Sequence, residues 1–350
     1  MKILVTGGYG FIGSNFIINQ INGENNKILN YDILTYAANT ENLKSFENND
    51  SYQFLRGDIK DSHLLKKCIK EFEPDAIINF AAESHVDRSI DGPKDFINTN
   101  IIGTYTLLQA ALDYYNSLNS KLKSQFRFLH VSTDEVYGSL GSEGLFKETT
   151  PYNPSSPYSA SKASSDHLVK AWFHTFELPI LITNCSNNYG PFQFPEKLIP
   201  LMIIKCLKKE KLPIYGDGKN IRDWLYVDDH CNAIYTVLKK GIIGETYNIG
   251  GDQEKTNLEI VNTICDTLDK KNPDKELNSY KDLITYVKDR PGHDFRYAID
   301  ASKIKNKLNW KPNYKFEEAI LKTVDWYLNN QMWWENILNN QYSLRRLGES

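Results

Sequence analysis

The sequence has 350 residues, of which 41% are hydrophobic and 24% are charged, and its formal net charge is −3. This length suffices for one large α/β unit or two modest domains. A net charge so near zero argues against nucleic acid or an anionic membrane as the main partner. No apolar run reaches the roughly 20 residues that span a bilayer, so the composition indicates an ordinary globular enzyme.

In the first half, short apolar runs alternate with segments of helical periodicity. Strands are expected at 2–6, 27–31, 52–56, 76–80, 126–132 and 179–184, and a later one at 245–250. Long helices are expected at 11–21, 95–115 and 155–176. This alternation predicts βαβ units that form a Rossmann-like, doubly wound parallel sheet with helices on both faces.

The second half is punctuated by prolines, which predicts shorter elements. Helices are expected at 195–209, 227–240, 258–268 and 316–328, and an exposed loop is expected at 270–279. The five scattered cysteines lack CxxC spacing, which predicts reduced thiols and neither a disulfide nor a metal site. Because a strand and a glycine loop open the sequence, we expect no secretory signal and a cytoplasmic location.

A glycine loop joins the first strand to the first helix. Gly7, Gly10 and Gly13 would allow a tight turn and a close approach of the backbone to a pyrophosphate at the helix N-terminus. Asp32 follows the second strand, where a carboxylate accepts hydrogen bonds from ribose hydroxyls and repels a 2′-phosphate. We therefore predict an NAD site, the alternative being a glycine-rich turn without a ligand.

The predicted domains follow from this motif. Residues 1–184, with about 221–250, are expected to form the NAD-binding Rossmann domain. A smaller mixed α/β substrate domain is expected from 185–220 and 251–330. The remaining segment, 331–350, is a C-terminal tail whose two tryptophans predict that part of it packs.

Tyr158 and Lys162 are four positions apart, which places a phenol and an ammonium on one face of a helix. A free tyrosine, with a pKa of about 10, is a poor base at neutral pH. We expect the lysine and a nicotinamide ring to favour the phenolate, which could take a proton from a sugar hydroxyl while hydride leaves the same carbon. The alternative is two solvated helix residues.

Thr133, Asp134 and Glu135 follow an expected buried strand, at the edge where α/β sheets bind ligands. Oxidation of a hexose at C4 makes the C5 proton acidic, and a base can then remove it. The C6 hydroxyl leaves only if an acid protonates it, so one base and one acid together eliminate water. Two adjacent carboxylates can be held at different pKa values for these roles, the alternative being two solvated loop acids.

The tripeptide lies in Ser132-Thr133-Asp134-Glu135-Val136-Tyr137-Gly138, which resembles the signature of the dTDP-glucose 4,6-dehydratases, in the extended short-chain dehydrogenase/reductase superfamily. The stretches 81–89, 184–191, 194–200, 221–227 and 290–294 carry the same resemblance, which runs from residue 1 to about 328. It implies conversion of dTDP-glucose to dTDP-4-keto-6-deoxyglucose and water, by C4 oxidation, C5/C6 elimination and hydride return to C6. It also implies a homodimer formed through the helices at 95–115 and 155–176.

The resemblance assigns Asp134 as the acid and Glu135 as the base, with Thr133 holding the sugar near Tyr158. The implied cofactor-binding residues are Gly7, Gly10, Phe11, Ile12, Gly13, Asp32, Ile33, Leu34, Thr35, Asp58, Ile59, Phe80, Ala81, Ala82, Ser84, Thr99, Tyr158, Lys162 and Asn188. The implied substrate-binding residues are Ser84, Thr133, Asn187, Lys197, Leu198, Pro213, Ile214, Tyr215, Arg222, Asn257, Asp289, Arg290 and His293. The cations among these suit a diphosphate.

Three residues depart from the family pattern: Tyr9, Ala38 and Phe295 replace residues common among relatives. His85 is expected to have a packing or hydrogen-bonding role. A nucleotide-sugar 4-epimerase shares the fold, NAD and the Tyr-Lys pair but needs no acid and base after the strand. A UDP-glucose dehydratase remains open, a GDP-mannose dehydratase would have Ser ahead of the glutamate, and a silent NAD-binding scaffold would not need the intact catalytic set.

Overall fold

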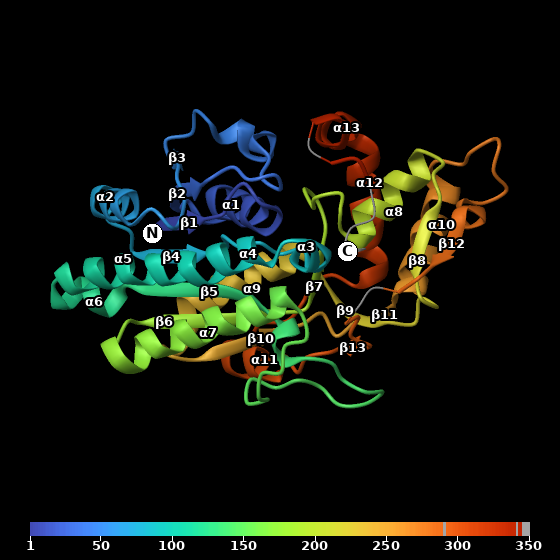
Figure 1. The fold of residues 1–350 in the computed structure, drawn as a ribbon. Coiled ribbons are helices and arrows are strands. Elements are labelled where there is room, and N and C mark those ends of the chain that lie inside the picture. Colours follow the sequence, from blue (N-terminus) through green and yellow to red (C-terminus); the bar gives the residue numbers. More distant parts are fainter. Residues whose placement is uncertain (290–291, 341, 345–350) are drawn as a thin grey trace.

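A seven-stranded parallel sheet forms the centre of the first half of the molecule (Figure 1). The computed structural model describes residues 1–289, 292–340 and 342–344. The strand order is β10-β6-β5-β4-β1-β2-β3. These strands are β1 Lys2–Thr6, β2 Lys27–Asp32, β3 Tyr52–Arg56, β4 Ala76–Asn79, β5 Arg127–Thr133, β6 Ile180–Cys185 and β10 Thr246–Ile249. Each expected strand is present within about one residue, and the predicted Rossmann-like fold is confirmed.

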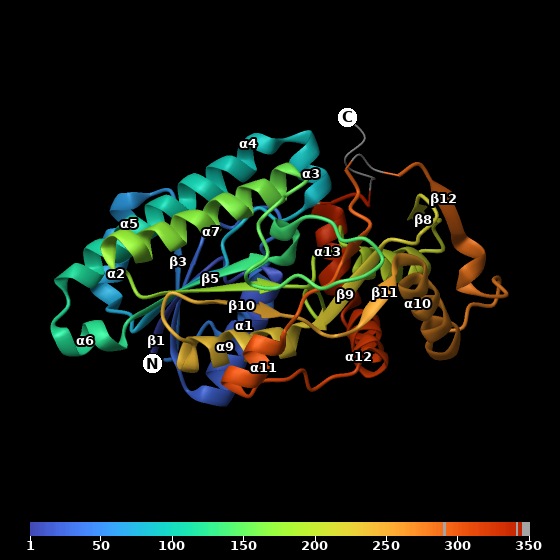
Figure 2. The same cartoon turned by 90° about the horizontal axis from the view of Figure 1, so that it is seen from below.

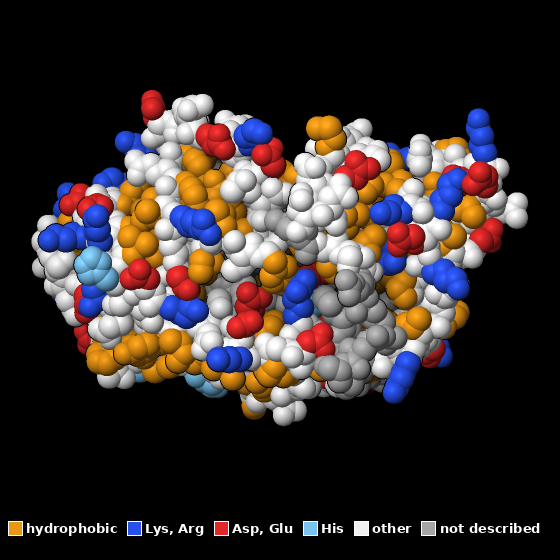
Figure 3. Space-filling model, turned by 45° about the horizontal axis from the view of Figure 1, so that its top comes forward, with side chains coloured by type: hydrophobic (Ala, Val, Ile, Leu, Met, Phe, Trp, Pro, Cys, Tyr) orange, Lys and Arg blue, Asp and Glu red, His pale blue; other side chains and the backbone are white. Residues whose placement is uncertain are grey.

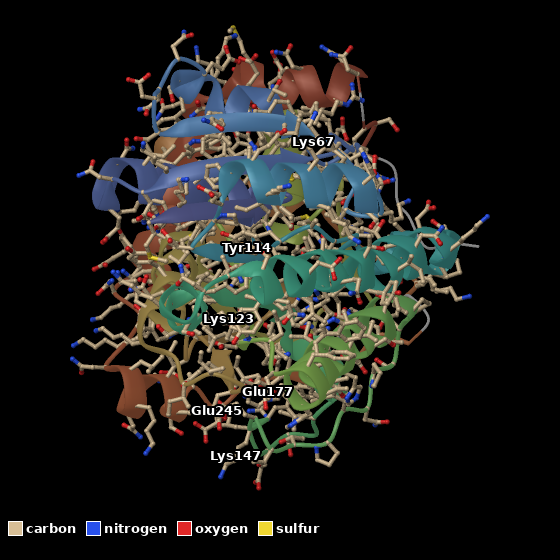
Figure 4. The ribbon with its side chains drawn as sticks, turned by 90° about the vertical axis from the view of Figure 1, so that its left-hand side faces the viewer. Lys67, Tyr114, Lys123, Lys147, Glu177 and Glu245 are labelled. Atoms are coloured by element: carbon tan, nitrogen blue, oxygen red, sulfur yellow. The ribbon has the colours of Figure 1, made fainter. Side chains whose placement is uncertain are left out.

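Successive residues of a strand point to opposite faces of the sheet. Because both faces carry apolar side chains, helices cover both. Ile3 and Val5 pack toward α1 Phe11–Glu24, α9 Val227–Lys240 and α11 Ser302–Leu308, on one face. Leu4 packs on the other face, toward α2 Ser62–Phe72, α5 Thr104–Ser117 and α7 Pro157–Phe176. The two helical layers lie on either side of the sheet in Figure 2, and α2, α5 and α7 lie side by side in Figure 4, where Lys67 and Tyr114 mark α2 and α5.

The expectation of one regular helix at 95–115 is wrong. The path consists of α4 Pro93–Phe96, a π-helical turn Ile97–Gly103 and then α5. The wider turn is held by Asn100, whose side chain accepts from the backbone N–H of Glu83 and donates to its carbonyl and to the Ser161 hydroxyl. Such π turns occur frequently at functional sites, and this one ties the helix to the segment that follows β4.

The second half has its own small sheets and core. Strand β9 Ile221–Tyr226 pairs with β7 Asn187–Tyr189, β11 Glu254–Thr256 and β13 Arg296–Tyr297, while β8 Leu212–Tyr215 pairs with β12 Ile284–Val287. Tyr189, Trp224 and Tyr327 are buried among α8 Leu198–Leu207, α10 Asn257–Lys271, α12 Phe316–Asn329 and α13 Gln331–Asn340. The remaining helical segments are η1 Thr40–Phe46, α3 Val86–Asp91, α6 Ser120–Gln125, η3 Asp134–Tyr137 and η4 Tyr280–Leu283.

Several expected bounds in this half need correction. The helix expected from residue 195 begins only at Leu198, and α10 extends through Lys271 into the expected loop. Trp334 is buried, so the first part of the tail packs as expected. No helix within the described residues is both long and apolar enough to cross a membrane.

Candidate active site

The glycine loop lies at the carboxyl end of β1 and requires its glycines. A Cβ atom on Gly7 would lie 2.7 Å from the Ala81 backbone nitrogen, and one on Gly13 would lie 2.4 Å from the Gly7 carbonyl oxygen. Gly10 is the N-cap of α1, and because glycine has no side chain, no capping side chain accepts from the first N–H groups of the helix. The first N–H groups of α1 are thus available to an anion, as a dinucleotide pyrophosphate requires.

Asp32 ends β2 beside this loop, and its carboxylate is already held in place. One oxygen accepts from the Tyr9 N–H at 2.9 Å and the other from the Leu34 N–H at 2.8 Å. Burial raises the pKa of Asp32, and these two hydrogen bonds oppose the rise. The ring of Tyr9 is buried edge-on against Phe54, with centroids 4.9 Å apart, so this departure from the family pattern fills space behind the loop.

A cavity of about 520 Å³ extends from the glycine loop to the end of β5. Its lining includes every implied cofactor-binding residue except Leu34: Gly7, Gly10, Phe11, Ile12, Gly13, Asp32, Ile33, Thr35, Asp58, Ile59, Phe80, Ala81, Ala82, Ser84, Thr99, Tyr158, Lys162 and Asn188. Leu34 contributes its backbone N–H to Asp32 instead. The glycine cradle, the open helix end and the acid at β2 therefore fit NAD.

The expected catalytic tripeptide lies at the other end of this cavity. Thr133 ends β5, and its hydroxyl accepts from the Glu135 backbone N–H at 3.3 Å, which caps the short helix η3. Asp134 is 1% exposed, whereas Glu135 is partly exposed. Thr133, Asp134, Glu135 and Tyr158 all line the cavity, so the structure brings the expected catalytic groups together.

Asp134 has the surroundings of a protonated acid. Burial raises its pKa well above the usual value, and the negative charges of Glu135 and Asp223 raise it further. One carboxyl oxygen lies 3.4 Å from the Thr133 hydroxyl. The other, Oδ2, has no hydrogen-bond partner among the described residues. A carboxyl group kept neutral in this way can donate a proton to a ligand.

Tyr158 and Lys162 both line this cavity, and burial shifts the pKa values of both. Burial, followed by the charge of Glu135, raises the pKa of Tyr158 well above 10, and the nearby Thr133 hydroxyl only partly offsets this. The Lys162 ammonium donates to the Val131 carbonyl at 2.9 Å and lies 3.3 Å from His130 Nε2. The phenolate expected from the lysine together with a nicotinamide ring is a prediction for the cofactor-bound enzyme.

A buried polar network lies behind Lys162, and the sequence analysis did not predict it. Asp166, one turn further along α7, has Oδ1 3.5 Å from His130 Nε2, and its other oxygen accepts from Ser132, Tyr152 and Asn184. Burial lowers the pKa of Lys162, and the negative charge of Asp166 opposes this. The spacing 162 to 166 on one helix face was the only sequence signal.

A second cavity, of about 280 Å³, adjoins the first, because Glu135, Asn187, Glu196 and Lys197 line both. Seven further implied substrate-binding residues line it: Leu198, Pro213, Ile214, Tyr215, Arg222, Asn257 and His293. Ser84 and Thr133 line the first cavity. Asp289 lines neither but lies with Oδ1 2.6 Å from His293 Nδ1, and Arg290 lies outside the described residues.

The guanidinium of Arg222 is fixed in the wall of the second cavity. It donates to the backbone carbonyls of Ile221 at 2.7 Å and Asp294 at 2.9 Å. It also lies over the Tyr297 ring, 4.3 Å from the centroid. A rigid cation in a pocket with Lys197 suits a diphosphate better than a mobile surface charge would.

An ion pair that the sequence did not reveal lies at the junction of the cavities. Arg88 Nε is 2.6 Å from a carboxylate oxygen of Glu196, and the Tyr36 hydroxyl donates to the other oxygen at 3.0 Å. The Arg88 guanidinium lies 3.8 Å from the Tyr36 ring centroid. His85 accepts from the Arg88 N–H and lies 3.3 Å from the Glu196 carbonyl, which fits its expected hydrogen-bonding role.

Known proteins resemble the chain over almost all of its length. Residues 4–323 match the profile of a family described as GDP-mannose 4,6 dehydratase. A dTDP-glucose 4,6-dehydratase of Xanthomonas campestris pv. campestris is 57% identical over 345 residues, covering 99% of this chain and 98% of that protein. The crystal structure of DesIV, a dTDP-glucose 4,6-dehydratase from Streptomyces venezuelae with NAD and TYD bound, is 44% identical. Its TM-score is 0.88, and the match covers 96% of this chain and 100% of that one. A UDP-glucose 4-epimerase of Thermotoga maritima is 28% identical, with a TM-score of 0.82 and coverage of 95% and 100%.

Proposed function

We propose that this chain, which belongs to the family of dTDP-glucose 4,6-dehydratases, is an NAD-dependent lyase that converts dTDP-glucose to dTDP-4-keto-6-deoxyglucose and water. The observation that carries the proposal is the pair of adjacent carboxyl groups, Asp134 and Glu135, that follows β5. Asp134 is buried with a raised pKa, and Glu135 lines both the cofactor-sized cavity and the second cavity. An epimerase has no elimination to perform and needs no such acid and base.

The residues of this chain supply positioning and proton transfer. Thr133 would hold the sugar near Tyr158, whose phenolate would take the proton of the C4 hydroxyl. Glu135 would remove the C5 proton, which is acidic once C4 is a ketone, and would return a proton to C5 when C6 is reduced. Asp134 would protonate the leaving C6 hydroxyl. When bound, NAD supplies the hydride acceptor at C4 and the hydride donor to C6, and its positive ring favours the phenolate that burial alone opposes.

The two cavities support a division of labour. Gly7, Gly10, Gly13 and Asp32 would hold the dinucleotide in the larger one. Lys197 and Arg222 would bind the diphosphate of the substrate in the smaller one. Two domains are part of the proposal: residues 1–184 with about 221–250 for the dinucleotide, and 185–220 with 251–330 for the nucleotide sugar. The packing of α9 and β10 with the seven-stranded sheet supports this division, whereas β9 pairs within the four-stranded sheet.

A substrate panel tests the proposal. The purified enzyme is incubated with dTDP-glucose, UDP-glucose and GDP-mannose, and the products are separated and assayed in alkali for the absorbance of a 4-keto-6-deoxy sugar. We expect this product from dTDP-glucose with the highest kcat/KM. Preferential elimination of water from UDP-glucose would change the assigned substrate from dTDP-glucose to UDP-glucose. Recovery of dTDP-galactose without elimination would show that the enzyme is an epimerase.

We also propose a cytoplasmic homodimer. The π turn, α5 and the end of α7 expose Ile97, Ile102, Tyr105 and Phe176, each 45–50% exposed. Hydrophobic side chains gather along the lower left of Figure 3, where this helical layer lies. Exposed apolar patches of this kind favour association. Light scattering coupled to gel filtration would give twice the chain mass for a dimer, and a monomer mass at micromolar concentration would refute it.

Fractionation of the producing cells would test the cytoplasmic location, and recovery outside the cytoplasm would contradict it.

A further inference from the structure

We propose that the C-terminal segment Tyr342–Leu344 is part of the nucleotide pocket and contacts the nucleoside diphosphate of the substrate. This inference rests on the proposed function, since it assigns the second cavity to a nucleotide sugar. It gives the tail a role that no sequence motif indicated. Tyr342 and Leu344 both line the second cavity, together with Tyr215, Arg222 and His293.

The path of the chain brings the segment to the cavity. After α13 ends at Asn340, the Tyr342 N–H donates to the Ile337 carbonyl at 3.1 Å, which keeps the tail against the helix. Tyr342 is 8% and Leu344 9% exposed, whereas Ser343 between them is exposed. The alternation turns the two large side chains inward, and both belong to the core of the second half.

Tyr342 packs on residues from distant parts of the sequence. Its ring centroid lies 5.9 Å from that of Phe194. Glu196, Arg88 and Tyr215 are close enough for their charges to act on its hydroxyl group. Glu196 and Arg88 form the ion pair at the junction of the cavities. The tail is therefore held against a preorganised wall of the pocket.

The chemistry of the cavity indicates which part of the substrate the tail contacts. Lys197 and Arg222 suit phosphate oxygens, while Pro213, Tyr215 and now Tyr342 provide flat surfaces for a base or a sugar ring. Neither tail residue lines the larger cavity, which holds Asp134 and Tyr158. The tail should consequently affect nucleotide binding and not the chemical steps.

Point variants of the full chain, loaded with NAD, test this inference. We expect Tyr342→Ala and Leu344→Ala each to weaken dTDP binding about tenfold in titration calorimetry, which corresponds to about 1.4 kcal/mol. KM for dTDP-glucose should rise in parallel, while kcat changes less than about threefold. Met332→Ala is the matched control, because this α13 side chain is 77% exposed and lines neither cavity. NAD content and Tm are measured for each variant.

Hydrogen exchange on the unmodified enzyme tests the inference even where a variant folds poorly. Peptides covering 338–350 should exchange at least threefold more slowly when dTDP is added. Unchanged dTDP affinity in well-folded variants, or unchanged exchange of the tail in the presence of saturating dTDP, would overturn the inference. If the parent enzyme bound neither dTDP nor UDP, the proposed function would fail first, and the role of the tail would fall with it.

Discussion

Replacing Asp134 by asparagine isolates the proposed acid. The amide has nearly the size of the carboxyl group, and the side chain is only 1% exposed. Because burial, Glu135 and Asp223 raise the pKa of Asp134 well above its usual value, the amide replaces a group that is already neutral. We therefore expect a stability change of no more than about 1 kcal/mol, the centre of the range for point substitutions.

The expected kinetic effect is large and confined to one step. Loss of a general acid typically costs a factor of about 10² to 10⁴, equivalent to about 2.7–5.4 kcal/mol of transition-state stabilisation. C4 oxidation uses Tyr158 instead and should change less than about threefold. Asp134→Asn should therefore accumulate reduced cofactor, because oxidation continues while water loss is slow.

The pH dependence follows from the sign of the shift. The acid works in its protonated form, so water loss in the parent enzyme should slow as pH rises through the raised pKa of Asp134. The folded state also holds this proton more tightly than the unfolded state, because the pKa of Asp134 is raised above 3.8 on folding. The stability that this proton provides is therefore present below that pH and is lost as the pH rises toward the raised pKa. Asp134→Asn should lack both effects.

A single-turnover experiment decides the matter. Enzyme in excess over dTDP-glucose is followed by absorbance of the reduced cofactor and by mass spectrometry of quenched sugar nucleotides. A substrate with fluoride at C6 should restore elimination, because fluoride leaves with less help from an acid. Asp113→Asn, on the exposed side of α5, is the control. Normal water loss in Asp134→Asn, or no rescue by fluoride, would refute the assignment.

Three further substitutions test other parts of the site. Glu135→Gln should abolish solvent exchange of the C5 proton yet still permit reduction of NAD, and unchanged turnover would remove Glu135 as the base. Gly13→Ala places a Cβ 2.4 Å from a backbone oxygen of the glycine loop and should lower bound NAD at least tenfold by spectrophotometry. Gly23→Ala, with open space around its Cβ, should retain NAD, and equal occupancy in both variants would contradict this. Asp166→Asn removes the charge that supports the pKa of Lys162, so the alkaline limb of kcat should move to lower pH, and an unshifted limb would contradict it.

The central sheet could be predicted because most of its strands are buried on both faces and read as apolar runs. The edge strand β3, with Gln53, Phe54 and Arg56 exposed, is the exception. The strands of the second half could not be predicted in this way. β7 has three residues and β13 has two, too few for any periodicity, and they exist because β9 offers backbone partners. The π turn was equally hidden, because it depends on the contact of Asn100 with a segment 17 positions away.

The chemistry of the site was predictable where a motif is local in sequence, and less so where it depends on burial. Tyr158 and Lys162 were identified from their spacing, but the burial that raises the tyrosine pKa follows only from the packed fold. The pair of Arg88 and Glu196, separated by 108 positions, and the network of Asp166 likewise form only after distant elements meet.

The adjacency of the two carboxyl groups after β5 also bears on their order of action. Burial and then the negative charge of Glu135 raise the pKa of Asp134. When Glu135 takes the C5 proton it becomes neutral, and its repulsion of a negative Asp134 ends. The pKa of Asp134 must then fall, so Asp134 becomes a stronger acid at the step in which the C6 hydroxyl leaves. Protonation of the base thus prepares the acid, and two carboxyl groups placed far apart could not be coupled in this way.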